Sequence, residues 1–273
     1  MAVKRGRRAI AILVLALTGC QPQSLQIAPT AETVALDLWS THAAAPLVRD
    51  LAVGYQDTHP EIRFAVRLAV ASNDTLLNAI AASDDSEAPT FGVTHYLPPD
   101  SSLWAAPLGR DRLAIVVHPD NPITGVNIPQ LQAIFQGRST DWAGISGEAG
   151  PITVVSREQG SGDRMAFEAL VMDGRPITLN ARLAASGDAV LAIVGQEPGA
   201  IGYVSTGLLD SRVRPLTING IPLGNGDGNY PFQTTMLIVG TAEPQGDYRD
   251  FFAWAQSPDG QAIVARRYLP LPQ

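Results

Sequence analysis

A strand, a polar loop and a helix follow one another in the stretch I-T-V-V-S-R-E-Q-G-S-G-D-R-M-A-F (152–167). Residues 152–155 are β-branched and mostly apolar, which is typical of a buried strand. Ser161 is a common helix N-cap and Asp163 a common first-turn acid, so a helix starts at this point. The stretch therefore predicts a strand-to-helix turn, and its polar loop carries Arg157 at the carboxyl end of a buried strand.

Strands and helices alternate along the rest of the chain. Short apolar or alternating runs predict strands, and apolar residues spaced three and four apart predict helices. Such alternation is typical of the α/β class with a largely parallel sheet. The predicted strands are 34–39, 62–68, 113–117, 152–155, 200–204 and 235–239, and the predicted helices are 44–56, 74–82, 129–135, 162–172, 189–194 and 248–256.

Hydroxyl side chains mark two further strand-to-helix turns. Ser40 and Thr41 follow the first predicted strand, and Ser72 opens the second helix. Ligands of open α/β sheets bind at the carboxyl ends of the strands, and the free N–H groups of a helix's first turn favour an anion. Arg157 can add a two-pronged, charge-assisted contact. Each residue taken singly is more often a cap than a ligand contact, but together they indicate an anion site.

The N-terminal residues predict export and lipid anchoring. Four basic residues precede the apolar run 9–17, which is shorter than the roughly 20 residues that span a bilayer. The step L-T-G-C (17–20) resembles a bacterial lipobox, which implies cleavage before Cys20 and lipid on its thiol. We expect residues 1–19 to be a lipoprotein signal peptide and the polar, proline-containing residues 20–32 to be a tether.

Residue usage excludes several kinds of site. Cys20 is the single cysteine, so a lipidated chain has no disulfide, cysteine nucleophile or thiolate metal site. Lys4 is the single lysine and leaves with the signal peptide, which excludes a lysine base or Schiff base. About 15 arginines then face 26 acidic residues, a net charge near −11 that argues against nucleic acid as a partner. An anion site must therefore be built locally from arginine and neutral donors.

Enzyme and metal motifs are missing from the sequence. It has no Gly-x-Ser-x-Gly elbow, and its four histidines lack metal-ligand spacing. We therefore expect no catalytic residue, no metal and no cofactor, and we interpret the histidines as turn or surface residues; they are His42, His59, His95 and His118.

Several segments resemble the phosphate-binding proteins of bacterial ABC importers. The resemblance rests on L-Q-A-I-F-Q-G (131–137) before Trp142, on the Arg157…Ser161-Gly162…Phe167 loop, on G-A-I-G-Y (199–203) and on S-P-D-G-Q (257–261). It extends from Leu38 to Pro270.

This resemblance implies the two-lobed periplasmic binding protein fold (type II), with the ligand cleft between the lobes. Lobe I would comprise 33–117 plus 229–273, and lobe II would comprise 118–228. The apolar strands 113–117 and 235–239 would be the two crossings.

The resemblance also implies a function. The chain would be an extracytoplasmic solute-binding lipoprotein, anchored to the membrane by its lipid and acting as a monomer. It would bind phosphate or a related oxyanion and pass it to an ABC transporter permease. Carried over by position, the ligand-binding residues would be Ser40, Thr41, Ser72, Arg157, Ser161 and Gly162, with Asp163 at the last position of the motif.

Two positions depart from the family pattern and leave the ligand open. Asp163 replaces a threonine, and Thr90 stands where we place the family's ligand-facing aspartate, which accepts a proton carried by the phosphate. Asp163, which would lie in the other lobe, could instead accept that proton from the ligand. Alternatively, its charge could repel anions, so that the site is altered and the protein is a sensor or binds another ligand. A hydrolase is the less favoured alternative.

Overall fold

The structure is a computed structural model that describes residues 32–83, 90–146, 150–224 and 229–272. The part from Glu32 onward is one compact unit. The predicted signal peptide, Cys20 and nearly all of the tether lie outside the described residues. Within the described ranges, no helix is both long enough and apolar enough to cross a bilayer.

Strands and helices alternate as the sequence predicts. The strands are β1 (Glu32–Thr41), β2 (Ile62–Ala71), β3 (Phe91–Thr94), β4 (Trp104–Val117), β5 (Gly125–Val126), β6 (Thr153–Arg157), β7 (Arg182–Ala184), β8 (Ala200–Ser205), β9 (Arg214–Pro215), β10 (Thr217–Ile218) and β11 (Gln233–Gly240). The helices are α1 (Ala45–Thr58), α2 (Asn73–Ala81), α3 (Ile128–Phe135), α4 (Ala143–Ser146), α5 (Gly162–Phe167), α6 (Gly187–Val194), α7 (Gly246–Gln256) and α8 (Pro258–Val264).

The helix predicted for 162–172 consists of two parts. An α-helical part, α5, ends at Phe167, and a π-helical turn continues it through Glu168–Met172. Asp173 then ends the helix in the left-handed region at φ 50°. A π-helical turn is a common local feature near functional sites.

One mixed sheet runs through both halves of the unit, in the order β2-β1-β3-β11-β4-β8-β6-β7 with β9 beside β4. The outer pairs β1–β2, β1–β3, β6–β7 and β6–β8 are parallel, as predicted. The central pairs β3–β11, β11–β4 and β4–β8 are antiparallel. The prediction of a largely parallel sheet is therefore wrong at the centre, where the chain crosses between the halves and returns.

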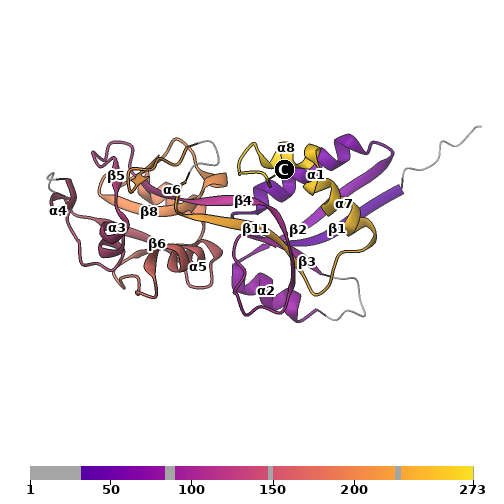
Figure 1. Ribbon diagram of the computed structural model, residues 1–273, viewed down its shortest axis with the longest axis horizontal. Coiled ribbons are helices and arrows are strands. Elements are labelled where there is room, and N and C mark those ends of the chain that lie inside the picture. The colour runs from indigo at the N-terminus through magenta and orange to yellow at the C-terminus, as the bar shows by residue number, and fades with distance from the viewer. Residues whose placement is uncertain (1–31, 84–89, 147–149, 225–228, 273) are drawn as a thin grey trace, which may run out of the picture. The chain divides into compact units, whose positions relative to one another are not determined.

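Strands β4 and β11 form the connection between the two halves, which we name lobe I and lobe II (Figure 1). They pair from Gln233 opposite Arg112 to Gly240 opposite Trp104. The register shifts between Met236 and Leu237, so one strand carries an extra residue there.

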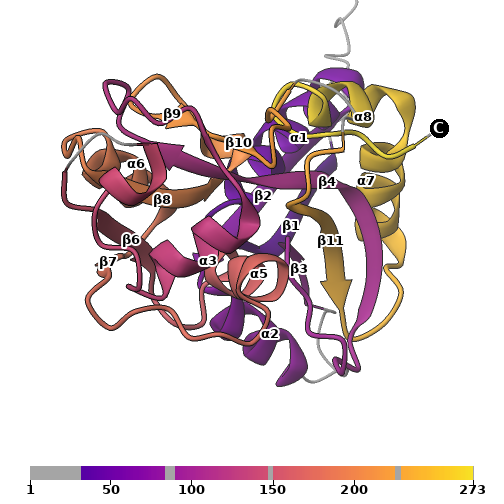
Figure 2. The ribbon, with the colours of Figure 1, turned by 60° about the vertical axis from the view of Figure 1, so that its left-hand side comes forward.

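Each lobe has its own apolar core. In lobe I, α1, α7 and α8 cover one face of the sheet, and α2 covers the other (Figures 1 and 2). In lobe II, α3 and α5 pack on one face and α6 on the other. All five residues of 113–117 are buried, and each large aliphatic side chain among them contributes about 1.5–3 kcal/mol by leaving water.

Candidate ligand-binding site

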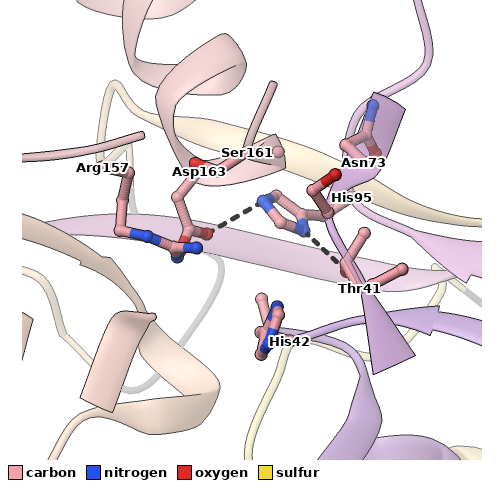
Figure 3. Close-up of a pocket in the computed structure, with 11 residues that line it drawn as sticks. Thr41, His42, Asn73, His95, Arg157, Ser161 and Asp163 are labelled. Carbon is pink, nitrogen blue, oxygen red and sulfur yellow. Dashed lines mark hydrogen bonds and ion pairs between the residues drawn. The ribbon is translucent and has the colours of Figure 1, made fainter. Parts of the chain in front are cut away.

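A small polar pocket lies where residues of both lobes meet (Figure 3). Lobe I contributes the end of β1, the start of α2 and the residue after β3. Lobe II contributes the end of β6 and the start of α5. The lining residues are Thr41, His42, Ala43, Ala71, Ser72, Asn73, His95, Arg157, Ser161, Gly162 and Asp163.

Six of the seven predicted ligand-binding residues line this pocket together. The seventh, Ser40, is fully buried, and its hydroxyl donates to the carbonyl oxygen of Thr41 at 2.9 Å. Ser40 therefore lies behind the pocket wall and is absent from the lining.

Two of the hydroxyls are helix caps as well as pocket residues. Ser72 Oγ accepts from the backbone N–H of Thr75 at 3.3 Å, and Ser161 Oγ accepts from that of Arg164 at 3.2 Å. A capping hydroxyl keeps its own hydrogen, so it can still donate to a ligand. Ser72 and Ser161 can therefore serve both as helix caps and as ligand contacts.

The guanidinium of Arg157 is buried, with only 2% of the residue exposed. Its Nε donates to Glu158 Oε2 and to the carbonyl of Ala184, both at 3.0 Å. Its Nη2 donates to Glu158 Oε1 at 2.8 Å and to the carbonyl of Ala185 at 3.3 Å. Nη1 donates to Asp163 Oδ2 at 2.8 Å. Among the described residues, one of its five N–H groups, on Nη1, is therefore left for a ligand.

Asp163 lies between a guanidinium and an imidazole that come from different lobes (Figure 3). Its Oδ2 accepts from Arg157, and its Oδ1 is 3.0 Å from Nε2 of His95. Burial alone would raise the pKa of Asp163, but the neighbouring His95 and Arg157 outweigh it and lower that pKa. Asp163 is therefore an ionised carboxylate.

His95 corrects the interpretation of the histidines as turn or surface residues. It is only 3% exposed, and its Nδ1 is 3.5 Å from Thr41 Oγ1. Burial would lower the pKa of His95, but the contact with Asp163 outweighs it and raises that pKa. The contact lacks the alignment of a hydrogen bond, and it is an ion pair when His95 is protonated.

Thr90 is not the position that faces the pocket. It precedes β3 and is absent from the lining, whereas His95 follows the last residue of β3 and lies in it. The rule that ligands bind at strand ends would have pointed to His95, had the short run F-G-V-T (91–94) been recognised as a strand.

The lobes are closed on each other around the pocket. The cavity is about 10 Å³, which is about the space of one water molecule. The backbone N–H of Asp74 donates to the carbonyl of Gly160 at 3.2 Å, and Asn73 Nδ2 contacts Met165 Sδ at 3.6 Å. Both contacts join the start of α2 in lobe I to the α5 region of lobe II.

A second buried carboxylate lies behind the pocket on β4. Asp111 accepts from Thr206 Oγ1 at 2.8 Å and from the N–H of Arg112 at 2.7 Å. Burial raises its pKa, although the charge of His95 and these hydrogen bonds oppose the shift. In the described part of the chain, no group of histidine or acidic side chains is arranged to hold a metal ion.

The fold is the two-lobed fold of periplasmic binding proteins, and the small polar pocket lies where residues of the two lobes meet. The sequence matches the PBP superfamily domain over residues 28–259, and the chain belongs to that family.

Curated relatives carry names that fit this family. The chain is 28% identical over 169 residues to the phosphate-binding protein PstS of Bacillus subtilis strain 168, covering 58% of this chain and 55% of that protein. It is 35% identical over 127 residues to the phosphate-binding protein PstS 2 of Streptococcus pneumoniae TIGR4, covering 42% and 44%. The chain thus matches about half the length of these relatives.

A solved structure with bound phosphate from Clostridium perfringens has the same fold. Its TM-score is 0.78 at 22% identity, and the match covers 88% of this chain and all of that one.

Proposed function

We propose that this chain is an extracytoplasmic, lipid-anchored solute-binding protein of an ABC importer. It binds phosphate or a related oxyanion between its lobes and delivers it to a permease, as a monomer and without turnover. The observation that carries the proposal is the convergence of hydroxyl groups from both lobes on a buried arginine, Arg157.

The chemistry of the lining supports an oxyanion. The hydroxyls of Thr41, Ser72 and Ser161 and the remaining N–H of Arg157 are donors, and charge-assisted hydrogen bonds to an anion contribute about 1.5–3 kcal/mol each. Gly162 lets the His95 ring of lobe I approach closely, because a Cβ there would lie 2.9 Å from that ring. The names of the relatives support phosphate as the first ion to test.

The lobe ranges fit the same proposal. We assign 33–117 plus 229–273 to lobe I and 118–228 to lobe II, with β4 and β11 as the crossings. Leu113 of β4 and Phe232, directly before β11, lie within the ranges assigned to lobe I but pack in the lobe II core, so the crossings reach into lobe II. Closure around a ligand would then bend these two strands.

Calorimetric titration tests the proposal. Phosphate, sulfate, arsenate, molybdate and small carboxylates would be added in turn to a soluble Cys20→Ser protein, up to millimolar concentration. We expect one equivalent of an oxyanion to bind and to be recovered unchanged. Absence of binding by every oxyanion, in the native protein and in variants of the pocket, would refute the proposal.

A second candidate function is favoured by the charges of the pocket. Glu158 and Asp163 neutralise Arg157, so the described form has little positive charge to offer an anion. The same fold would then serve as a sensor or bind a ligand other than phosphate. The titration separates the two candidates, because a sensor of another ligand shows no heat with phosphate.

A further inference from the structure

The carboxylate of Asp163 lies at the centre of the pocket's charges. Its two oxygens contact Arg157 of lobe II at 2.8 Å and His95 of lobe I at 3.0 Å. The side chains of Asp163 and His95 are 1% and 2% exposed, so water screens this contact little. A carboxylate thus receives charged contacts from both lobes, which is what a bound oxyanion would receive.

The same arrangement leaves no room for a free oxyanion. The cavity is about 10 Å³, and a tetrahedral ion with four oxygens needs several times the volume of one water molecule. The lobes nevertheless already make the direct contacts between Asp74 and Gly160 and between Asn73 and Met165.

We propose that Asp163 is an internal anion, which takes the place of the oxyanion between Arg157 and His95. The lobes therefore close without a bound oxyanion, and a free oxyanion binds only by displacing this carboxylate. The inference rests on the proposed function, because it concerns the same cleft, and it names the residue that sets the affinity of that cleft.

Among Asp163, Arg157 and His95, His95 is the residue whose charge responds to pH. The groups that face it are Asp163 and Arg157 of lobe II, Thr41 beside Nδ1, and Asp111 behind it on β4. Because the two carboxylates raise the pKa of His95, the ion pair is present below the ordinary histidine value of about 6.5 and is lost as pH rises through the higher pKa of the closed form. Closure without ligand therefore weakens as pH rises.

Spin-label distances test the proposal. In a Cys20→Ser background, Val53→Cys in α1 and Leu179→Cys in lobe II place labels on two exposed positions, 63% and 102% exposed. Double electron–electron resonance at about pH 6 would measure the label distance in native and Asp163→Asn proteins, with and without millimolar inorganic phosphate. Calorimetry on the same proteins would give their phosphate affinities.

We expect the native protein to show one short distance with or without phosphate. The Asp163→Asn protein should show a longer distance that returns to the short one with phosphate, and it should bind phosphate at least about tenfold more tightly than the native protein. A native protein that closes only on adding phosphate, combined with weaker binding by Asp163→Asn, would overturn the proposal.

A pH series keeps the test decisive if Asp163→Asn does not fold. Native protein should shift toward the long distance as pH is raised above the ordinary histidine pKa of about 6.5. His95→Gln should already be open at the lower pH, whereas the control His118→Gln should behave as native. A native distance that does not change with pH would overturn the proposal.

The two hypotheses fail in different ways. If no pocket variant binds any oxyanion but the labels report closure that depends on Asp163, the proposed function fails and the internal anion stands. If the native protein binds phosphate tightly and opens without it, the proposed function stands and the internal anion fails.

Discussion

The ring of Tyr203 stacks on the ring of Phe167, with centroids 4.2 Å apart and planes 7° apart. The hydroxyl of Tyr203 contacts Ser156 Oγ at 2.8 Å and accepts from the backbone N–H of Arg157 at 3.1 Å. One side chain of β8 thus holds the last residues of β6 and the end of α5, the two elements that carry Arg157 and Asp163.

Tyr203→Phe is expected to lower the free energy of unfolding by about 1–3 kcal/mol, because it leaves the buried N–H of Arg157 without its acceptor. Urea unfolding measures the change. Tyr248→Phe is the matched control: its hydroxyl also bonds backbone groups, those of Asp37, but at an exposed site, so its loss should be smaller. Equal losses in the two variants would contradict the prediction.

Arg157→Ala is expected to weaken oxyanion binding by at least about tenfold, or about 1.4 kcal/mol. It should also destabilise the protein by about 3–5 kcal/mol, because Asp163 loses its partner inside the protein. Calorimetry and urea unfolding measure the two effects.

Two further variants test where the expected loss of stability in Arg157→Ala comes from. Arg212→Ala removes an exposed arginine paired with Asp188 and Asp210 and should cost at most about 1 kcal/mol. Adding Asp163→Asn to Arg157→Ala should recover part of the stability. If it recovered none, the cost would not come from the unpaired carboxylate.

Asp111→Asn is expected to stabilise the protein at neutral pH and to have little effect near pH 3. The folded protein raises the pKa of Asp111 above its unfolded value of 3.8, so the native state binds the proton more tightly. Stability is therefore lost as pH rises from the unfolded toward the folded pKa, and a neutral amide that keeps the acceptor oxygen avoids this loss. Urea unfolding of both proteins at several pH values measures the difference in stability. An Asp111→Asn protein less stable than native at pH 7 would contradict the prediction.

Gly160→Ala is expected to disfavour the closed lobes. Gly160 has φ +82°, and an added Cβ would lie 2.5 Å from Asp74 Oδ2 of lobe I. Gly174→Ala is the control, since Gly174 has a similar φ of +75° with open space around it. Both variants should lose stability through the backbone, but only Gly160→Ala should lengthen the distance between labels on the two lobes. The same distance in both variants would contradict this.

Cys20→Ser is expected to give a protein that is soluble or unprocessed, because the predicted lipid attaches to this thiol. Intact-mass measurement on protein from a bacterial host, with and without the substitution, checks it. A wild-type protein without added lipid mass would refute the anchor.

The sequence predicted most elements because their apolar patterns agree with their burial. Residues 113–117 are the clearest case, being apolar in sequence and fully buried in the structure. The strand nevertheless begins at Trp104, in a stretch that contains Pro107, Gly109 and three charged residues. These residues have poor strand propensity, and pairing with β11 decides their conformation.

The pocket was predictable in part for a similar reason. Capping serines and a loop arginine can be recognised locally, and six of the seven predicted residues meet in one pocket. The partner of Asp163 could not be recognised, because His95 comes from the other lobe, 68 positions earlier in the chain, and nothing in the local sequence records that contact.

The antiparallel pairing of β4 with β11 also has a topological consequence. The chain leaves lobe I on β4 and comes back on β11, so the crossing residues Arg112 and Gln233 lie one strand spacing apart, about 4.7–4.9 Å. Adjacent antiparallel strands can be joined by a two-residue turn. Lobe II is thus an insertion between two paired antiparallel strands. It could be exchanged for the corresponding lobe of a relative without changing the path of the chain in lobe I.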